Sequence, residues 1–142
     1  MDNRGVTMPG FAERVRQSFE RQGAMALIGA RLLDLRPGYC ALTLTPRPET
    51  SQQHGYVHAG ILATLVDSAG GYAGYSLFPE NASVLTVEFK LNLLAPIRSG
   101  TIRAEAEIIS MTSRTAVVRI DITNDGRAAA AAQGTVLVMA PK

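Results

Sequence analysis

A single carboxylate interrupts one of the most apolar stretches of the chain. Asp67 follows Leu62-Ala63-Thr64-Leu65-Val66 and precedes Ser68-Ala69, in a segment whose apolar residues would cover most of the circumference of a helix. Burying a carboxylate without partners costs several kcal/mol. Either a neighbouring Ser or Thr hydrogen-bonds Asp67 as a structural group, or the carboxylate does chemistry in a cleft. The residues alone leave both interpretations open.

A histidine stands nine residues before this carboxylate. That separation corresponds to about two and a half helical turns, and we expect the helix to begin at His58. The backbone amides of Ala59, Gly60 and Ile61 would then lack partners within the helix and would form a site for developing negative charge. Small side chains at 59 and 60 keep this end open to a carbonyl oxygen. An ordinary helix start, with small residues for packing, is the alternative interpretation.

The remaining polar candidates are too few for a metal site. The chain has two histidines and one cysteine, and the only ligand-like spacing is His54-x-x-x-His58. We therefore expect no metal, and we interpret His54 as a polar loop residue. The single Cys40 excludes a disulfide within the chain and is typical of a reducing compartment. Its apolar neighbours predict a small apolar strand residue.

Two helices and a hairpin are expected around these residues. Gly10 to Gln22 carries apolar residues at fourfold spacing and predicts a short amphipathic helix. From Met25 to Pro46, alternating apolar residues on both sides of Arg36-Pro37-Gly38 predict a β-hairpin. Pro46 to Val57 predicts a loop. The apolar helix that follows is rich in glycine, which indicates close packing against a sheet or a second subunit.

The chain after Pro79 is dominated by strand patterns. Ser83 to Leu94, 102–108, 116–122 and Gly134 to Ala140 predict strands in a β-meander. Turn residues separate them at Arg98-Ser99-Gly100, Thr112-Ser113-Arg114 and Asn124-Asp125-Gly126. One long apolar helix beside about five antiparallel strands is an α+β layout, in which the sheet curls around the helix. Such a sheet leaves an edge uncovered, and dimerisation is a natural remedy.

The composition describes one globular domain and excludes several classes of partner. With 142 residues, 46% of them hydrophobic, one core suffices; we expect a tail and amphipathic helix at 1–24 ahead of the main fold at 25–142. A net charge of +2 without a basic cluster argues against nucleic acid. No apolar stretch reaches the roughly 20 residues of a membrane-spanning helix, and no signal peptide is visible. We therefore expect a soluble, cytoplasmic protein without a membrane partner.

Two segments of the sequence resemble a known enzyme family. Ser51 to Ala69 contains His-Ala-Gly and an acidic residue nine positions after the histidine, and it resembles the signature of hotdog-fold acyl-CoA thioesterases of the PaaI type. These belong to the 4-hydroxybenzoyl-CoA thioesterase-like superfamily. Thr86 to Pro96 resembles the family's long strand ending in proline, before a glycine that is here Gly100. The resemblance implies a hotdog fold, a curled antiparallel sheet wrapped around one long helix, and hydrolysis of an acyl-CoA thioester.

The resemblance assigns roles to individual residues. Asp67 matches the acidic residue that acts as general base on water or as nucleophile on the thioester carbon. The amide of Ala59 matches the oxyanion donor, at a position where the family usually has glycine. His58 matches the motif histidine that orients the loop or the thioester. Further catalytic positions are implied at Gln52 and Thr86, which hold or position water, and substrate contacts at Gly60, Ser68 and the turn residue Arg114, where relatives meet coenzyme A phosphates.

The resemblance also implies an assembly. Relatives form homodimers that pair into homotetramers, with the site at the subunit interface, so Asp67 of one chain would work with Gln52, His58 and Ala59 of another. Coenzyme A enters as part of the acyl-CoA substrate, and no cofactor is expected. Two alternatives stay open. One is a hotdog dehydratase or hydratase that moves water across a double bond, and the other is a non-catalytic acyl-CoA binding or sensor protein.

Overall fold

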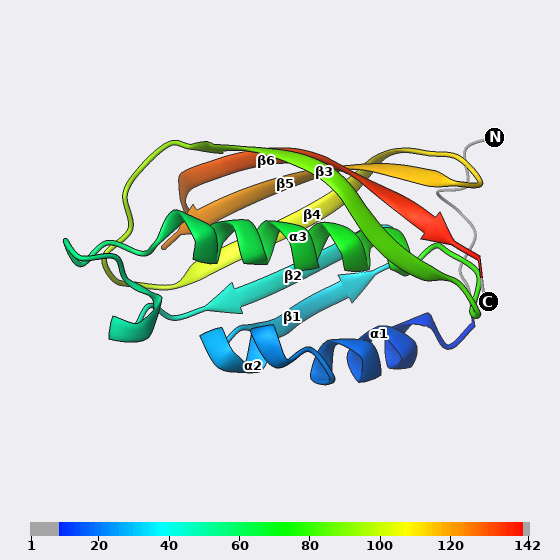
Figure 1. Ribbon diagram of the computed structural model, residues 1–142, viewed down its shortest axis with the longest axis horizontal. Helices are drawn as coiled ribbons and strands as arrows, with labels where there is room; N and C mark the ends of the chain where they lie inside the picture. Colours follow the sequence, from blue (N-terminus) through cyan, green and yellow to red (C-terminus); the bar gives the residue numbers. More distant parts are fainter. Residues whose placement is uncertain (1–8, 141–142) are drawn as a thin grey trace.

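A computed structural model describes residues 9–140, which form one six-stranded antiparallel sheet around a long helix (Figure 1). The predicted N-terminal tail at 1–8 and residues 141–142 lie outside the described residues. The sheet order is β1-β2-β4-β5-β6-β3, and the α+β prediction is confirmed. No helix between residues 9 and 140 has the length and apolar character needed to cross a membrane. The elements are α1 (Phe11–Glu20), α2 (Gly23–Ile28), β1 (Arg31–Arg36), β2 (Tyr39–Leu44), the 3-10 helix η1 (Pro48–Thr50), α3 (Ala59–Tyr75), β3 (Ser83–Leu93), β4 (Ile102–Met111), β5 (Thr115–Asn124) and β6 (Arg127–Met139).

Helix α3 packs on one face of the sheet at close range. Leu65, on its inner side, is completely buried, and the strands beneath alternate buried and exposed residues, as half-buried strands do. Two glycines allow the approach. A Cβ at Gly70 would lie 3.4 Å from Ile120 Cδ1, and a Cβ at Gly74 would lie 3.2 Å from Val136 Cγ2. The predicted close packing of the glycine-rich helix against a sheet is confirmed.

Helix α1 confirms the predicted amphipathic helix and holds the C-terminal end of α3. Its apolar side buries Val15 and Phe19. Arg14 Nη2 donates hydrogen bonds to the carbonyl oxygens of Tyr75 at 2.8 Å and Phe78 at 3.1 Å, and the guanidinium lies 4.5 Å from the centre of the Tyr75 ring. A cation is favoured at this position because the last carbonyls of a helix lack partners and carry the negative end of its dipole.

Two predicted boundaries are wrong. Residues 25–30, predicted as the start of the hairpin, belong to α2 and its end, because Met25 and Ile28 share a buried helical side and Gly29 terminates the helix at φ 78°. The hairpin consists of β1 and β2 alone. Strand β6 begins at Arg127 instead of Gly134, because the alanines at 128–132 pair with β5 on one side and, from Ala130, with β3 on the other.

Strand β3 lies at an open edge of the sheet. The predicted meander is formed by β4, β5 and β6, whereas β3 pairs antiparallel with β6. A bulge interrupts this pairing between Thr86 and Glu88. Leu85, Val87 and Leu93 along the strand are more than half exposed. An edge strand with exposed apolar side chains is a surface on which a second chain can pair.

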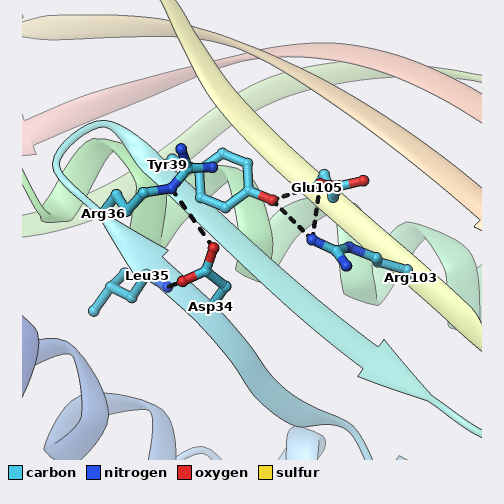
Figure 2. A network of polar contacts seen from close by, with 6 residues as sticks. All are labelled: Asp34, Leu35, Arg36, Tyr39, Arg103 and Glu105. Atoms are coloured by element: carbon cyan, nitrogen blue, oxygen red, sulfur yellow. Dashed lines mark hydrogen bonds and ion pairs between the residues drawn. The ribbon is translucent and has the colours of Figure 1, made fainter.

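The face of the sheet turned away from α3 carries a polar network, which Figure 2 shows. Tyr39 of β2 donates to Glu105 Oε1 at 2.5 Å, and Arg103 Nη2 lies 3.1 Å from the same oxygen. Arg36 of β1 stacks 3.9 Å from the centre of the Tyr39 ring. Burial, and next the hydrogen bond to Glu105, raise the pKa of Tyr39. The network joins β1, β2 and β4 on the side opposite the candidate chemistry.

Candidate active site

Asp67 lies on the side of α3 that the sheet leaves uncovered. Its side chain is exposed and lines an open groove of about 790 Å³, whose walls come from α3, β3 and the C-terminal end of α1. Thr86 and Ser68 line the same groove. The structure therefore brings together three of the residues that the sequence singled out.

The expectation that α3 has almost no solvated face is wrong for the single chain. The sheet covers one side of the helix, and Thr64, Asp67 and Gly71 recur at helical spacing along the other. The neighbouring hydroxyls do not satisfy the carboxylate. Thr64 Oγ1 donates to the Gly60 carbonyl at 2.9 Å, and Ser68 Oγ donates to Gln22 Oε1 at 3.0 Å. The purely structural interpretation of Asp67 therefore lacks the contacts it requires.

The start of α3 leaves one backbone donor for an outside acceptor. His58 is the N-cap, as predicted, and its Nδ1 accepts a hydrogen bond from the Gly60 amide at 2.8 Å. The amide of Ile61 donates to the His58 carbonyl at 2.9 Å. Of the three predicted donors, only the Ala59 amide has no acceptor among residues 9–140. Because Nδ1 accepts, the neutral His58 ring carries its proton on Nε2.

The loop before α3 is tied to the same end of the helix. The His58 amide donates to the Thr50 carbonyl at 2.9 Å, and the Val57 amide donates to the Ile97 carbonyl at 2.8 Å. Gln52 Oε1 accepts from the His54 amide within this loop, which leaves the Gln52 Nε2 donor for another partner. Gln52, His58, Ala59 and Gly60 thus form one group at the N-terminus of α3.

This group is separated from Asp67 along the helix. Asp67 follows Ala59 by eight positions, and at a rise of 1.5 Å per residue that corresponds to about 12 Å along the helix axis. A single thioester carbonyl cannot contact both positions, because a donor and an attacking group must each lie about 3 Å from it. Within one chain the predicted site residues therefore form two groups, one at the start of α3 and one at its middle.

The remaining sequence candidates lie apart from both groups. Arg114 is exposed in the β4–β5 turn, next to the Thr115↔Leu137 pair of β5 and β6. His54 is exposed in the loop, as predicted. Cys40 lies in β2, which confirms the predicted strand residue, and it is completely buried. Burial raises the pKa of its thiol to about 12.

A chain of polar contacts in the groove wall has no counterpart in the sequence analysis. Gln22 Nε2 donates to the Tyr72 hydroxyl at 2.7 Å, and Ser18 Oγ lies 3.1 Å from the same oxygen. Gln22 Oε1 in turn accepts from Ser68. Burial raises the pKa of Tyr72. The only signal in the sequence was the spacing of Ser18 and Gln22 on one helical side. The contacts themselves join residues 46 to 54 positions apart, and no local pattern predicts them.

Comparison with known proteins identifies the family. The family model for the Thioesterase superfamily matches residues 54–131, a segment that contains His58, Asp67 and Thr86. The chain belongs to the thioesterase superfamily. The resemblance that the two motifs carry is confirmed, and the match extends well beyond them into β6.

Solved structures of other proteins share the fold of this chain. A thioesterase family protein from Silicibacter pomeroyi is 41% identical, with a TM-score of 0.87 over 92% of this chain and 99% of that chain. The Escherichia coli PaaI protein has the same TM-score at 19% identity, over 96% of this chain and 99% of that chain. At 19% identity this second likeness concerns the fold alone. The predicted hotdog architecture is confirmed.

Curated relatives are less similar in sequence than the Silicibacter pomeroyi protein. A 1,4-dihydroxy-2-naphthoyl-CoA hydrolase from Listeria monocytogenes is 26% identical over 103 residues, which cover 72% of this chain and 84% of that protein. A Pasteurella multocida protein that bears the provisional name of esterase is 34% identical over 80 residues. That match spans 56% of this chain and 58% of the relative's length.

Proposed function

We propose that the protein hydrolyses an acyl-CoA thioester to a carboxylic acid and coenzyme A. The observation that supports this most is the exposed Asp67 carboxylate, which lies in a groove on α3. The start of the same helix offers the Ala59 amide, which has no acceptor among the described residues. A base or nucleophile and an oxyanion donor are the two groups that acyl transfer requires. Membership of the thioesterase superfamily agrees with this chemistry.

The proposal takes the two groups from different chains. Because about 12 Å separates Ala59 from Asp67 along one helix, the donor near a given Asp67 comes from a second copy. The open β3 edge with its exposed apolar side chains supports a homodimer, in which each chain completes the site of the other. Two such dimers would form a homotetramer.

The proposed reaction balances without a cofactor. Asp67 removes a proton from water as the water oxygen bonds to the carbonyl carbon. The Ala59 amide of the second copy stabilises the oxyanion that forms. The carbon–sulfur bond then breaks, and the coenzyme A thiolate takes up a proton. In the direct route, Asp67 itself bonds to the carbon and water hydrolyses the resulting anhydride. Thr86 and Gln52 position the water, His58 orients the loop, Gly60 and Ser68 contact the substrate, and Arg114 binds a phosphate of coenzyme A.

Thiol release from acyl-CoA esters, followed with a chromogenic thiol reagent, tests the two groups separately. Asp67→Asn and Asp67→Ala should lower turnover about 100-fold or more. Ala59→Pro removes the amide hydrogen while proline remains favourable at the first position of a helix, and the residue before it is already extended (φ −64°, ψ 135°). It should also cost about 100-fold. Ala59→Gly and Asp121→Asn, whose carboxylate pairs with Arg119 on the outer face, are the controls and should retain activity.

Mixed oligomers test the composite site. When Asp67→Asn and Ala59→Pro chains are refolded together, half of the dimers contain one of each, and one of their two sites is intact. About a quarter of wild-type activity should return. Unchanged turnover in the Asp67 variants would reject the catalytic role of Asp67. Double-bond hydration without thiol release would favour a hydratase, and saturable binding without any reaction would favour a binding protein.

A further inference from the structure

One glycine in the middle of α3 has no packing reason to be glycine. A Cβ added at Gly71 would meet nothing within 4 Å, whereas a Cβ at Gly70 would lie 3.4 Å from Ile120 and one at Gly74 would lie 3.2 Å from Val136. Glycine inside a helix destabilises it relative to alanine. At Gly70 and Gly74 close packing on the sheet explains that loss, but at Gly71 it does not.

The empty space at Gly71 belongs to the groove. Gly71 follows Asp67 by one helical turn on the same side, and both line the groove. Farther along, the groove passes Tyr75 and the first residues of β3. Any side chain at position 71 would project into this space directly beside the carboxylate. The missing side chain therefore sets the width of the groove one turn, about 5.4 Å, from the reacting group.

We infer that Gly71 is a specificity-determining residue that admits acyl groups that are wide next to the thioester carbon. This inference rests on the proposed function, because it places the acyl group between Asp67 and Tyr75. An acyl group with a ring or a branch at the carbon next to the thioester carbonyl needs a wide groove at the position of Gly71. A narrow group such as acetyl ends before that position.

The walls of the groove favour a ligand over a second copy as the occupant of this space. Both walls belong to this chain, since Ser18, Arg21 and Gln22 of the N-terminal region form one side and residues 83–89 of β3 form the other. The first wall is held on α3 by the hydrogen bonds of Gln22 to Tyr72 and Ser68. In the proposed dimer the second copy brings the start of its α3 to Asp67, one helical turn before Gly71, and the space over Gly71 is left for the acyl group.

The test replaces Gly71 with side chains of increasing size and measures both binding and turnover in the full chain. Gly71→Ala and Gly71→Leu are compared with Gly23→Leu, a matched control at an exposed helical glycine that also has nothing within 4 Å of its Cβ position. Binding uses acetonyl-CoA and phenacyl-CoA, ketones that carry a methylene between sulfur and carbonyl and cannot be hydrolysed. Turnover uses acetyl-CoA and benzoyl-CoA.

Gly71→Leu should weaken phenacyl-CoA binding and benzoyl-CoA kcat/KM about 30-fold or more, and change the acetyl compounds less than about threefold. Gly71→Ala should give a smaller loss in the same direction and raise the melting temperature by about 3 °C. The inference would be overturned by equal losses for both acyl groups or by no loss at all. It would also be overturned if neither ketone bound, or if the oligomer dissociated in Gly71→Leu. Selective loss of ketone binding in a protein that releases no thiol would reject the proposed hydrolysis and retain the role of Gly71.

Discussion

Substitution of Gly60 by alanine should reveal the energy of the His58 cap on α3. A Cβ at Gly60 would lie 3.0 Å from His58 Nδ1 and 3.3 Å from Cε1, so the ring must move, and we expect it to lose the hydrogen bond from the Gly60 amide. Loss of an N-cap costs about 1 kcal/mol. Alanine in place of glycine inside a helix contributes about 0.5 to 1 kcal/mol. The two effects oppose each other, so Gly60→Ala should change the free energy of unfolding by nearly zero.

The same substitution should behave differently once the cap is gone. His58→Ala should cost about 1 kcal/mol, and adding Gly60→Ala to it should then restore about 0.5 to 1 kcal/mol. The double-mutant cycle should therefore show a coupling of about 1 kcal/mol between the two positions. His58→Asn is the matched control, because asparagine is among the best N-cap residues.

Urea unfolding at one fixed protein concentration measures all five proteins, since association would otherwise change the apparent stability. If Gly60→Ala stabilises the wild type and the His58→Ala protein equally, the ring does not cap the helix. The conclusion that Ala59 carries the one free amide would then fail, because the Gly60 amide would be free as well.

Two further predictions concern the sheet. Gly134→Ala should destabilise the protein by about 1 to 3 kcal/mol, because its Cβ would lie 2.9 Å from the Glu88 carbonyl oxygen in the β3–β6 ladder. Urea unfolding of this variant and of the wild type measures the difference, and equal free energies of unfolding would contradict the prediction. Cys40 has a raised thiol pKa of about 12 and is fully buried, so it should resist a thiol reagent at pH 8 until the protein unfolds. Because a raised folded-state pKa contributes stability below the unfolded pKa, that contribution should decline from about pH 9 towards pH 12, and a Cys40→Ala protein should lack this part of the pH dependence.

Local patterns in the sequence predicted the elements that local physics controls. The start of α3 at His58 follows from small residues and an apolar run, and the structure places the N-cap there. The turn at Arg36-Pro37-Gly38 needs a left-handed residue, and Gly38 has φ 76°. Gly126 in the β5–β6 turn has φ 80°. In each case the backbone conformation depends on neighbouring residues.

Longer-range features escaped the sequence analysis. Alternation at residues 26–30 is too short to distinguish a strand from α2, and the packing of Met25 and Ile28 decided in favour of the helix. The pairing of β3 with β6 joins residues more than 35 positions apart, which no local pattern specifies. The Gln22–Tyr72 contact spans 50 positions.

The sequence by itself determined the types and spacing of the candidate reacting groups, because a carboxylate nine residues after a helix start can be read from residue order alone. Tertiary structure decided which of these groups are available. The sheet covers one side of α3 and leaves Asp67 in a groove, the His58 ring occupies the Gly60 amide, and Gly71 faces open space although Gly70 and Gly74 do not. Exposure and free hydrogen-bonding capacity depend on what packs against a residue, and most of those neighbours come from distant parts of the chain.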